Sequence, residues 1–343
     1  MIKSSNRIMN TKLNNIDPGK LRSLQRVTSW DGYFLICALD HLSDFQELLD
    51  PDPKTVTYQR TGDAKIELIR SLAAECSAFL LDARFGLAQA IVSRALPGSI
   101  GLMASIEDED YKPDTVNRKT RFREHWSIKQ MKLLGVDVCK LLWFYRPDTD
   151  VAEHQREVVR SLVRECAELS LPLVVEPIWF PLAGEDPKSE AWKKRRVRGI
   201  VESAHEADSF GVDILKVEFP GYVETEEGRA QALEACKKLD AGVSVPWMLL
   251  SAGVGYEAFK TQVEIACRAG GSGFMAGRSI WRDAASTHDL KKRASAAKDA
   301  ARRLSELAAL TRKHGKPFAP QLEGAALAQM FPDGWYRQWQ RGR

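Results

Sequence analysis

The sequence predicts an α/β protein whose fold is a (β/α)8 barrel, with an N-terminal arm and a C-terminal extension. Eight short apolar runs alternate with amphipathic segments along the 343 residues. The runs are apolar at odd and even positions alike, which is typical of parallel strands that face helices on one side and a packed barrel interior on the other. The chain length suits one such barrel with extensions.

Each of the eight apolar runs is close to strand length. They are YFLICALD (Tyr33–Asp40), AFLLD (Ala78–Asp82), IGLMAS (Ile100–Ser105), VCKLLWFY (Val138–Tyr145), LPLVVEP (Leu171–Pro177), ILKVEFP (Ile214–Pro220), WMLLSAG (Trp247–Gly253) and GFMAG (Gly273–Gly277). Helical periodicity fills most of the intervals, at Asp63–Cys76, Val151–Leu169, Ala191–Phe210, Glu226–Leu239, Glu257–Ala269 and Leu290–Thr311. An open doubly wound sheet is the alternative, and it is disfavoured because no G-x-G-x-x-G motif follows an early strand.

This pattern divides the chain into three segments. We expect residues 1–20 to form a flexible arm, residues 21–311 the barrel, and residues 312–343 a C-terminal extension. Residues 107–125 are mixed in charge and follow the third strand, on the side where a barrel carries its active-site loops. We therefore expect residues 107–125 to form a lid.

The C-terminal extension is rich in aromatic residues. It contains Trp335, Tyr336 and Trp339 beside several arginines. Aromatic side chains at this density usually pack, so we expect the extension to lie against the barrel or against a neighbouring subunit of a homo-oligomer.

Composition limits the classes of partner. The formal charge of +4 is small for this length and predicts neither a nucleic-acid nor a membrane partner, although a modest positive bias suits an anionic substrate. No apolar run reaches the roughly 18 residues that a membrane span needs, and the N-terminus lacks a signal-peptide apolar core. The six cysteines form no C-x-x-C motif and indicate buried thiols in a reducing, cytoplasmic compartment.

Three charged residues on adjacent predicted strands carry the chemistry. Lys140, Glu176 and Lys216 lie in the fourth, fifth and sixth runs. In the sixth run Lys216 alternates with apolar residues that must meet the helices, so its side chain is expected to face the barrel interior. Burial and a second lysine favour a neutral amine, which Schiff-base formation requires, and Glu176 would transfer protons. A structural ion pair is the alternative, although three buried charges are costly unless they are used.

Two glycine-containing segments predict a phosphate site. SAGVG follows the seventh strand, and GFMAGR spans the eighth. Glycine lets backbone N–H groups approach an anion, and barrels often bind phosphate after strands seven and eight. Ordinary turn glycines are the alternative. The predicted phosphate-binding residues are Ser251, Gly253, Gly277 and Arg278.

Three further residues are candidates for the site. Asp40 ends the first run and is expected to hold a substrate hydroxyl or to orient Lys216. His41 and Asp82 are candidates for contact with the substrate, and loop capping or packing is the alternative for each. The six histidines include no H-x-x-x-H motif or carboxylate-linked pair, so we expect neither a metal nor another cofactor.

Several strings resemble the tagatose-1,6-bisphosphate aldolase family, which is related to the sulfofructose-phosphate aldolases. They are ALDH (Ala38–His41), LLDARFGLA (Leu80–Ala88), KLLWFY (Lys140–Tyr145), DILKVEFP (Asp213–Pro220), LLSAGV (Leu249–Val254) and AGRSIW (Ala276–Trp281). The resemblance extends from about residue 28 to about residue 309. It implies a class I aldolase with a (β/α)8 fold that needs no metal.

The resemblance also assigns roles. It implies that Lys216 is the Schiff-base lysine, that Glu176 transfers protons and that Lys140 and Asp40 assist. The predicted phosphate residues would then hold the phosphate of dihydroxyacetone phosphate. The chain departs from the family after Asp40, where His41 and Leu42 replace the usual glutamine and arginine.

This departure leaves the far end of the substrate open. The expected reaction is reversible cleavage of a phosphorylated ketose, similar to tagatose 1,6-bisphosphate, to dihydroxyacetone phosphate and an aldehyde. One alternative is a sulfofructose-phosphate aldolase or another aldolase with a different distal anion. Further alternatives are a non-catalytic regulator that binds a sugar phosphate and a barrel lyase or isomerase that works without an imine.

Overall fold

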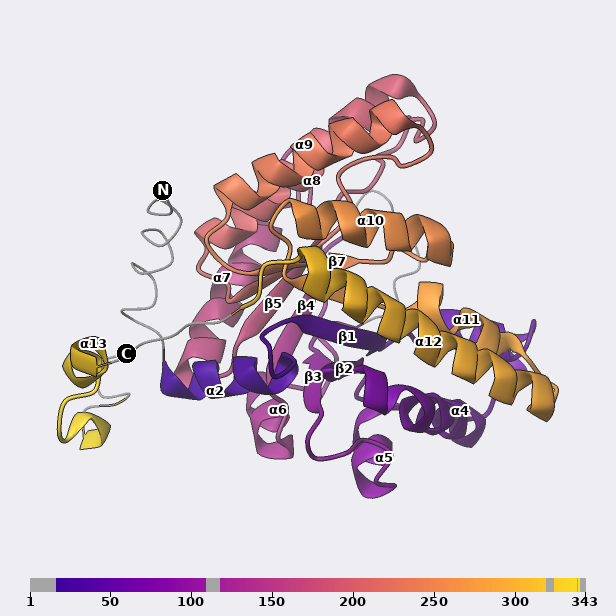
Figure 1. Ribbon diagram of the computed structural model, residues 1–343, viewed down its shortest axis with the longest axis horizontal. Helices are drawn as coiled ribbons and strands as arrows, with labels where there is room; N and C mark the ends of the chain where they lie inside the picture. The colour runs from indigo at the N-terminus through magenta and orange to yellow at the C-terminus, as the bar shows by residue number, and fades with distance from the viewer. Residues whose placement is uncertain (1–16, 109–117, 319–323, 338, 340–343) are drawn as a thin grey trace.

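A closed barrel of eight parallel strands forms the centre of the molecule (Figure 1). The computed structural model describes residues 17–108, 118–318, 324–337 and 339. The strands are β1 (Phe34–Leu39), β2 (Ala78–Leu81), β3 (Gly101–Ser105), β4 (Val138–Phe144), β5 (Leu173–Ile178), β6 (Ile214–Val217), β7 (Trp247–Leu250) and β8 (Gly273–Ala276). Strands pair in chain order, and β8 closes on β1 with Gly273 opposite Phe34. The predicted (β/α)8 fold is confirmed, and the open-sheet alternative is wrong.

Helices separate the strands and form the outer layer. They are α2 (Pro18–Val27), α3 (Ser43–Leu49), α4 (Tyr58–Leu72), α5 (Leu87–Val92), α6 (Ile128–Leu134), α7 (Ala152–Glu168), α8 (Glu190–Ser209), α9 (Glu226–Gly242), α10 (Tyr256–Arg268), α11 (Arg278–Ser286), α12 (Leu290–His314) and α13 (Gly324–Met330), with 3-10 turns at Pro53–Thr55, Ala73–Glu75 and Trp335–Arg337. Every predicted helix is present. The additional helices have about three turns or fewer and carry too little periodicity to be recognised in the sequence.

Helix α2 closes the N-terminal end of the barrel. Its Leu24 and Val27 side chains join the cluster of apolar residues in the barrel interior. Asp17 caps the helix, and Pro18 occupies its first turn, where a missing N–H costs nothing. The helix therefore begins within the segment predicted to be an arm, and residues 1–16 of that segment lie outside the described residues.

Side-chain alternation along the strands creates two layers. The interior cluster contains at least one residue from every strand, and one level of it consists of Ile36, Leu80, Met103, Val138, Val174, Ile214, Met248 and Met275. The residue after each of these packs outward with the helices. Lys140, Glu176 and Lys216 each lie two residues beyond an interior residue, so strand alternation turns all three toward the C-terminal mouth of the barrel.

The C-terminal extension begins with the end of α12. Beyond that helix, Phe318 returns to the bottom of the barrel and lies 6.1 Å from Phe34 between ring centroids. Trp335 lies edge-on to Tyr336 and Trp339, and the three side chains are 37%, 60% and 42% exposed respectively. In Figure 1, α13 stands apart from the strands. Packing of these aromatics on the barrel or on a neighbouring subunit remains a prediction.

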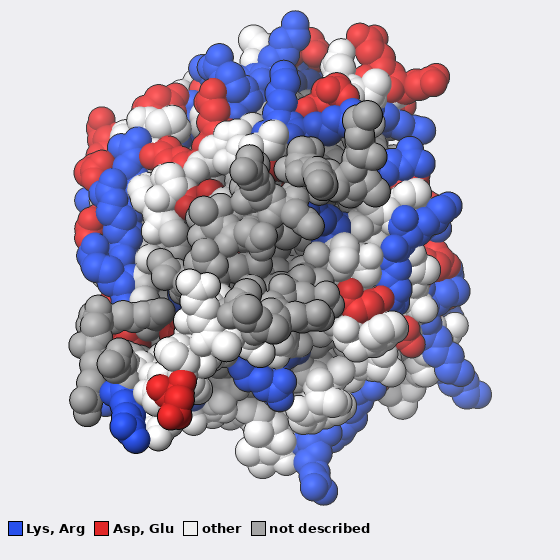
Figure 2. Space-filling view, turned by 60° about the vertical axis from the view of Figure 1, so that its left-hand side comes forward, with Lys and Arg blue, Asp and Glu red and all other residues white. Residues whose placement is uncertain are grey.

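The surface carries charges of both signs, as the small formal charge predicts (Figure 2), and the cysteines are buried, as their positions predict. On the face seen in Figure 2, basic and acidic side chains are interspersed around the rim. All six cysteines are buried free thiols. Within the described residues, no helix combines the length and the apolarity that a membrane crossing requires.

Candidate active site

A cavity of about 410 Å³ lies at the C-terminal ends of the strands. Its walls come from β1 and β4–β8 and from the loops that follow several of them. Nine of the predicted site residues line it, namely Asp40, His41, Lys140, Glu176, Lys216, Ser251, Gly253, Gly277 and Arg278. The structure thus brings together residues that are far apart in the chain.

Lys216 and Glu176 form an ion pair within this cavity. The Lys216 Nζ lies 2.9 Å from the Glu176 Oε1. The register between β5 and β6 pairs Val174 with Ile214, which places the two charged side chains at the same level of the barrel. Both residues are only 6% exposed. A carboxylate in direct contact with a buried amine is well placed to take its proton and to return it.

Lys140 is surrounded by three carboxylates. Its Nζ lies 2.6 Å from Oε1 of Glu107, 3.1 Å from Oε2 of Glu176 and 3.4 Å from Oδ2 of Asp40. Glu176 therefore bridges Lys140 and Lys216. This arrangement makes Lys140 a fixed positive charge among acids and leaves Lys216, paired with the bridging carboxylate, as the nucleophile candidate.

The acids around Lys140 differ in their electrostatics. Burial disfavours the ionised form of Asp40, but nearby positive charges, that of Lys140 most of all, outweigh it and hold the pKa of Asp40 well below its usual value. At Glu107, burial outweighs the attraction of Lys140 and raises the pKa. Asp40 therefore remains a carboxylate throughout the physiological range and can accept a hydrogen bond from a hydroxyl.

The loop after β7 and the start of α11 form a cradle of backbone amides. Ala252 and Gly253 are consecutive left-handed residues, with φ of 47° and 70°. The Gly277 N–H donates to the Ser251 Oγ at 3.3 Å. A Cβ atom at Gly277 would lie 2.9 Å from Cε1 of His41, so a larger residue would displace the imidazole or the backbone of this loop. Among the described residues no side chain caps α11, so its first amides and positive end suit an anion.

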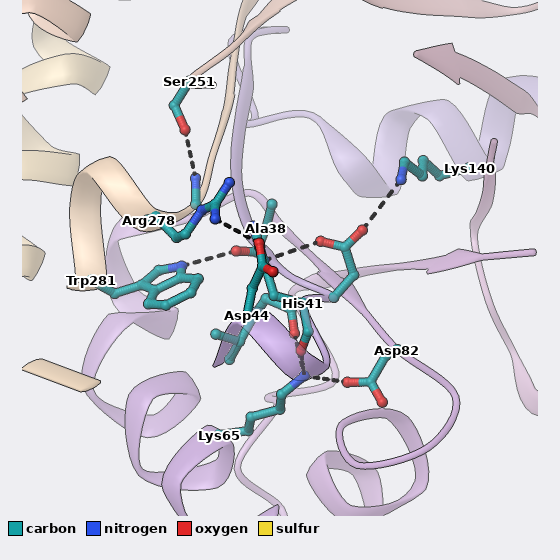
Figure 3. A network of polar contacts seen from close by, with 12 residues as sticks. Ala38, His41, Asp44, Lys65, Asp82, Lys140, Ser251, Arg278 and Trp281 are labelled. Carbon is teal, nitrogen blue, oxygen red and sulfur yellow. Dashed lines mark hydrogen bonds and ion pairs between the residues drawn. The ribbon is translucent and has the colours of Figure 1, made fainter. Parts of the chain in front are cut away.

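Arg278 lies beside this cradle and contacts an acid across the mouth of the cavity. Its guanidinium approaches Gly253, where a Cβ atom would lie 3.4 Å from Nε. Its Nη1 also lies 2.6 Å from Oδ2 of Asp44 on α3 (Figure 3). Both side chains are partly exposed, at 32% for Arg278 and 51% for Asp44. An incoming phosphate would compete with the Asp44 carboxylate for this guanidinium.

His41 adds a neutral imidazole to the wall. Burial lowers the pKa of His41 to about 3, with help from the charges of Arg278, Lys65 and Lys216 and against the attraction of Asp40. Its Nδ1 lies 3.6 Å from Oδ1 of Asp40 and has no hydrogen-bond partner among the described residues. A neutral ring with a free nitrogen can donate to or accept from a substrate hydroxyl.

Asp82 lies away from the cavity. Its side chain is fully buried and forms an ion pair with Lys65 of α4. Its other oxygen accepts the backbone N–H groups of Arg84 and Phe85. Asp82 therefore stabilises the loop after β2, as the loop-capping alternative expects, and it does not line the cavity.

The prediction omitted two acids of the site. Glu107 follows β3 and contacts Lys140, although its segment is expected to be a lid; residues 109–117 of that segment lie outside the described residues. Glu218 follows β6, lines the cavity, accepts the Trp179 N–H at 2.7 Å and pairs with Arg196. Both acids continue the inward alternation of their strands, which is the signal that identifies them.

Comparison with known sequences places the chain among aldolases. A family model described as DeoC/LacD family aldolase matches residues 54–283. The chain is similar to Tagatose 1,6-diphosphate aldolase 1 of Enterococcus faecalis, with 28% identity over 285 residues that cover 79% of this chain and 86% of the relative. It is also similar to Tagatose 1,6-diphosphate aldolase of Lactococcus lactis, with 25% identity over 281 residues, or 76% and 84% of the two chains.

Solved structures share the fold at lower sequence identity. A Schiff-base-forming fructose-1,6-bisphosphate aldolase aligns with a TM-score of 0.58 and 20% identity over 85% of this chain and 99% of the other. Fructose-bisphosphate aldolase from Plasmodium falciparum aligns with a TM-score of 0.64 and 13% identity over 91% and 96%. At these identities the likeness concerns the fold. Because the family model matches well over half of the sequence, the chain belongs to the DeoC/LacD family and is an aldolase.

Proposed function

We propose that this aldolase works by a class I mechanism and cleaves a phosphorylated ketose, similar to tagatose 1,6-bisphosphate, reversibly to dihydroxyacetone phosphate and an aldehyde. The observation that carries the proposal is the buried array in which Glu176 bridges Lys216 and Lys140. The amide cradle beside Arg278 lies in the same cavity. The proposed nucleophile and the proposed phosphate site therefore line the same cavity.

The first half of the cycle forms the imine. Glu176 takes a proton from the Lys216 ammonium, and the free amine adds to the ketose carbonyl. The resulting carbinolamine receives that proton on its hydroxyl and loses water, which leaves a protonated imine and an ionised Glu176. The short contact between Lys216 and Glu176 supports these transfers without movement of the protein.

The second half breaks the carbon–carbon bond. Glu176 takes the proton of the C4 hydroxyl, the C3–C4 electrons move into the protonated imine, and the aldehyde departs from the resulting enamine. Glu176 then protonates C3, and water hydrolyses the imine to release dihydroxyacetone phosphate and Lys216. Asp40 holds a substrate hydroxyl, and Lys140 stabilises the ionised acids around it.

Covalent trapping tests this proposal. The protein is incubated with dihydroxyacetone phosphate, reduced with borohydride and mapped by mass spectrometry. We expect a reduced adduct on Lys216 that disappears in Lys216→Arg. An adduct that survives in Lys216→Arg and disappears in Lys140→Arg would show that Lys140 is the nucleophile instead, and the absence of any adduct would refute the imine mechanism.

The distal half of the substrate has a second candidate. His41 and Leu42 follow Asp40, and the cavity wall beyond the lysines contains Leu142, Phe144 and Ile178. Because His41 and Leu42 stand where the family usually has glutamine and arginine, a sulfofructose-phosphate aldolase, or an aldolase for a substrate with another distal anion, is the alternative. Cleavage rates on tagatose 1,6-bisphosphate, fructose 1,6-bisphosphate and sulfofructose phosphate distinguish these candidates. The family assignment disfavours the non-catalytic regulator.

The proposal includes a cellular setting and an assembly. Six buried free thiols suit a cytoplasmic protein. The exposed aromatic cluster of Trp335, Tyr336 and Trp339 suits contact with a second copy of the chain. Light scattering on the full chain and on a chain that ends at residue 318 measures the number of subunits in each assembly. The same number of subunits in both would refute the role of the tail.

A further inference from the structure

Lys65 lies behind the segment that carries Asp40, outside the cavity. Its side chain is fully buried on α4. The ammonium donates to the carbonyl oxygen of Leu39 at 2.9 Å, to that of His41 at 2.7 Å and to the Asp82 carboxylate (Figure 3). An ammonium has three donors, and each of these donors has an oxygen acceptor here.

The surroundings of Lys65 exclude water and fix its position. The rings of Phe45 and Phe85 enclose the ammonium, with centroids 5.2 Å and 5.9 Å from Nζ. Both phenylalanines are buried. Asp82, the counter-ion, is itself held by the backbone amides of Arg84 and Phe85. A dry, fully satisfied group of this kind is rigid, because the loss of any one contact leaves a buried polar atom unpaired.

We propose that Lys65 is a positioning residue of the aldolase, which sets the direction of the Asp40 carboxylate by holding the two carbonyls on either side of it. Leu39 and His41 are the chain neighbours of Asp40, so the hydrogen bonds from Lys65 to both carbonyl oxygens fix the backbone of Asp40 from outside the barrel. The Asp40 side chain then points inward, where its Oδ2 lies 3.4 Å from Nζ of Lys140.

This inference rests on the proposed function, in which Asp40 holds a substrate hydroxyl during cleavage. A second consequence follows from the charge of Lys65. Burial and the charge of Arg278 lower the pKa of His41 most, and the charge of Lys65 adds to them. The pKa of about 3 that results keeps the ring beside Asp40 neutral. Lys65 therefore affects both the geometry and the protonation of the wall formed by β1.

The test separates the support of Asp40 from general stability. In Lys65→Met/Asp82→Asn, no uncompensated charge remains, and the side-chain oxygen of the introduced asparagine can still accept the two loop amides. We expect kcat per active site, counted by borohydride trapping of Lys216 with dihydroxyacetone phosphate, to fall about 10- to 100-fold while KM changes less than about threefold, since a displacement near 1 Å has effects of this size. Asp82→Asn alone keeps the ammonium on both carbonyls and should retain kcat within about threefold, even if its stability falls.

A matched control exists at the opposite end of the barrel. Lys20 of α2 forms a largely buried ion pair with Asp213 at 2.8 Å, before the start of β6. We expect Lys20→Met/Asp213→Asn to lose stability but to keep kcat within about twofold, because this pair is remote from the cavity.

Three outcomes would overturn the inference. They are a wild-type kcat in Lys65→Met/Asp82→Asn, an equal loss in the control pair, and a loss in Asp82→Asn as large as that in the double variant. In each case a Lys216 adduct in the unmodified protein would leave the proposed function standing. If the unmodified protein forms no adduct, the proposed function fails, and this inference fails with it.

Discussion

Replacement of Lys140 by methionine removes the central cation of the site. Its ammonium touches Glu107, Glu176 and Asp40 at 2.6, 3.1 and 3.4 Å, and its side chain is 3% exposed. At an effective dielectric constant of about 20, each contact corresponds to roughly 5–6 kcal/mol of gross attraction. Desolvation offsets much of this attraction, and removal of one partner from a buried ion pair costs about 3–5 kcal/mol. We expect a loss of this size, and a protein that is still folded, since folded domains have about 5–15 kcal/mol of stability.

The loss should depend on pH in a defined direction. In the unmodified protein, the lowered pKa of Asp40 contributes stability above its unfolded pKa of about 3.9, and this contribution disappears as the pH falls below that value. Without Lys140, burial is opposed by fewer charges, so the pKa of Asp40 rises and its ionisation above pH 4 becomes unfavourable. Lys140→Met should therefore destabilise the protein more at pH 7 than at pH 4.

Chemical unfolding of both proteins at pH 4 and pH 7 measures this difference. A loss below about 1 kcal/mol at pH 7 would contradict the ionised array. An equal loss at both pH values would show that lost packing, rather than uncompensated carboxylates, explains the destabilisation. Lys140→Met/Glu107→Gln should recover part of the stability at pH 7, because it removes one of the unpaired buried acids.

Three further predictions concern the mouth of the cavity. Asp44→Asn should strengthen inhibition by inorganic phosphate about two- to fivefold, because it frees Arg278 from a partly exposed ion pair of up to about 1 kcal/mol; competition kinetics measure this change. Gly277→Ala should weaken phosphate binding at least about tenfold, since its Cβ would lie 2.9 Å from the His41 ring; calorimetry with dihydroxyacetone phosphate measures this change. The unmodified protein should lose up to about 2 kcal/mol of stability between pH 7 and pH 5, because His41 stays neutral in the folded state, with its pKa of about 3, and takes up a proton on unfolding below its unfolded pKa of about 6.5. His41→Gln should abolish this pH-dependent loss, and unfolding curves at both pH values measure it.

Matched controls accompany the first two of these predictions. Glu47→Gln removes one exposed charge from α3, the helix that carries Asp44, at a position that does not line the cavity, and should leave phosphate inhibition unchanged. Gly255→Ala adds a methyl group where no atom lies within 4 Å and should leave phosphate binding unchanged. Weaker inhibition in Asp44→Asn, or equal losses in the two alanine variants, would contradict the described cradle. An unaltered pH dependence in His41→Gln would assign that dependence to another group.

The sequence by itself predicted the barrel and most of the charged residues that line its cavity. Eight apolar runs with helices between them leave few other folds, and strand alternation turns Lys140 and Lys216 inward because their chain neighbours are apolar. The glycines after strands seven and eight predict an anion site, and Gly253 and Gly277 line the same cavity. These features depend on local periodicity and on the order of elements, which a single sequence carries.

Only the tertiary structure decided the roles of the residues just beyond the strand ends. Asp82 and Glu107 both occupy inward positions if their strands are extended, yet Glu107 reaches Lys140 while Asp82 turns away to Lys65. The reason is that Asp82 accepts the amides of the next turn, which redirects the chain and presents its carboxylate to a helix distant in sequence. Beyond a strand, side-chain direction is set by such long-range partners, and the sequence does not encode them in any local pattern.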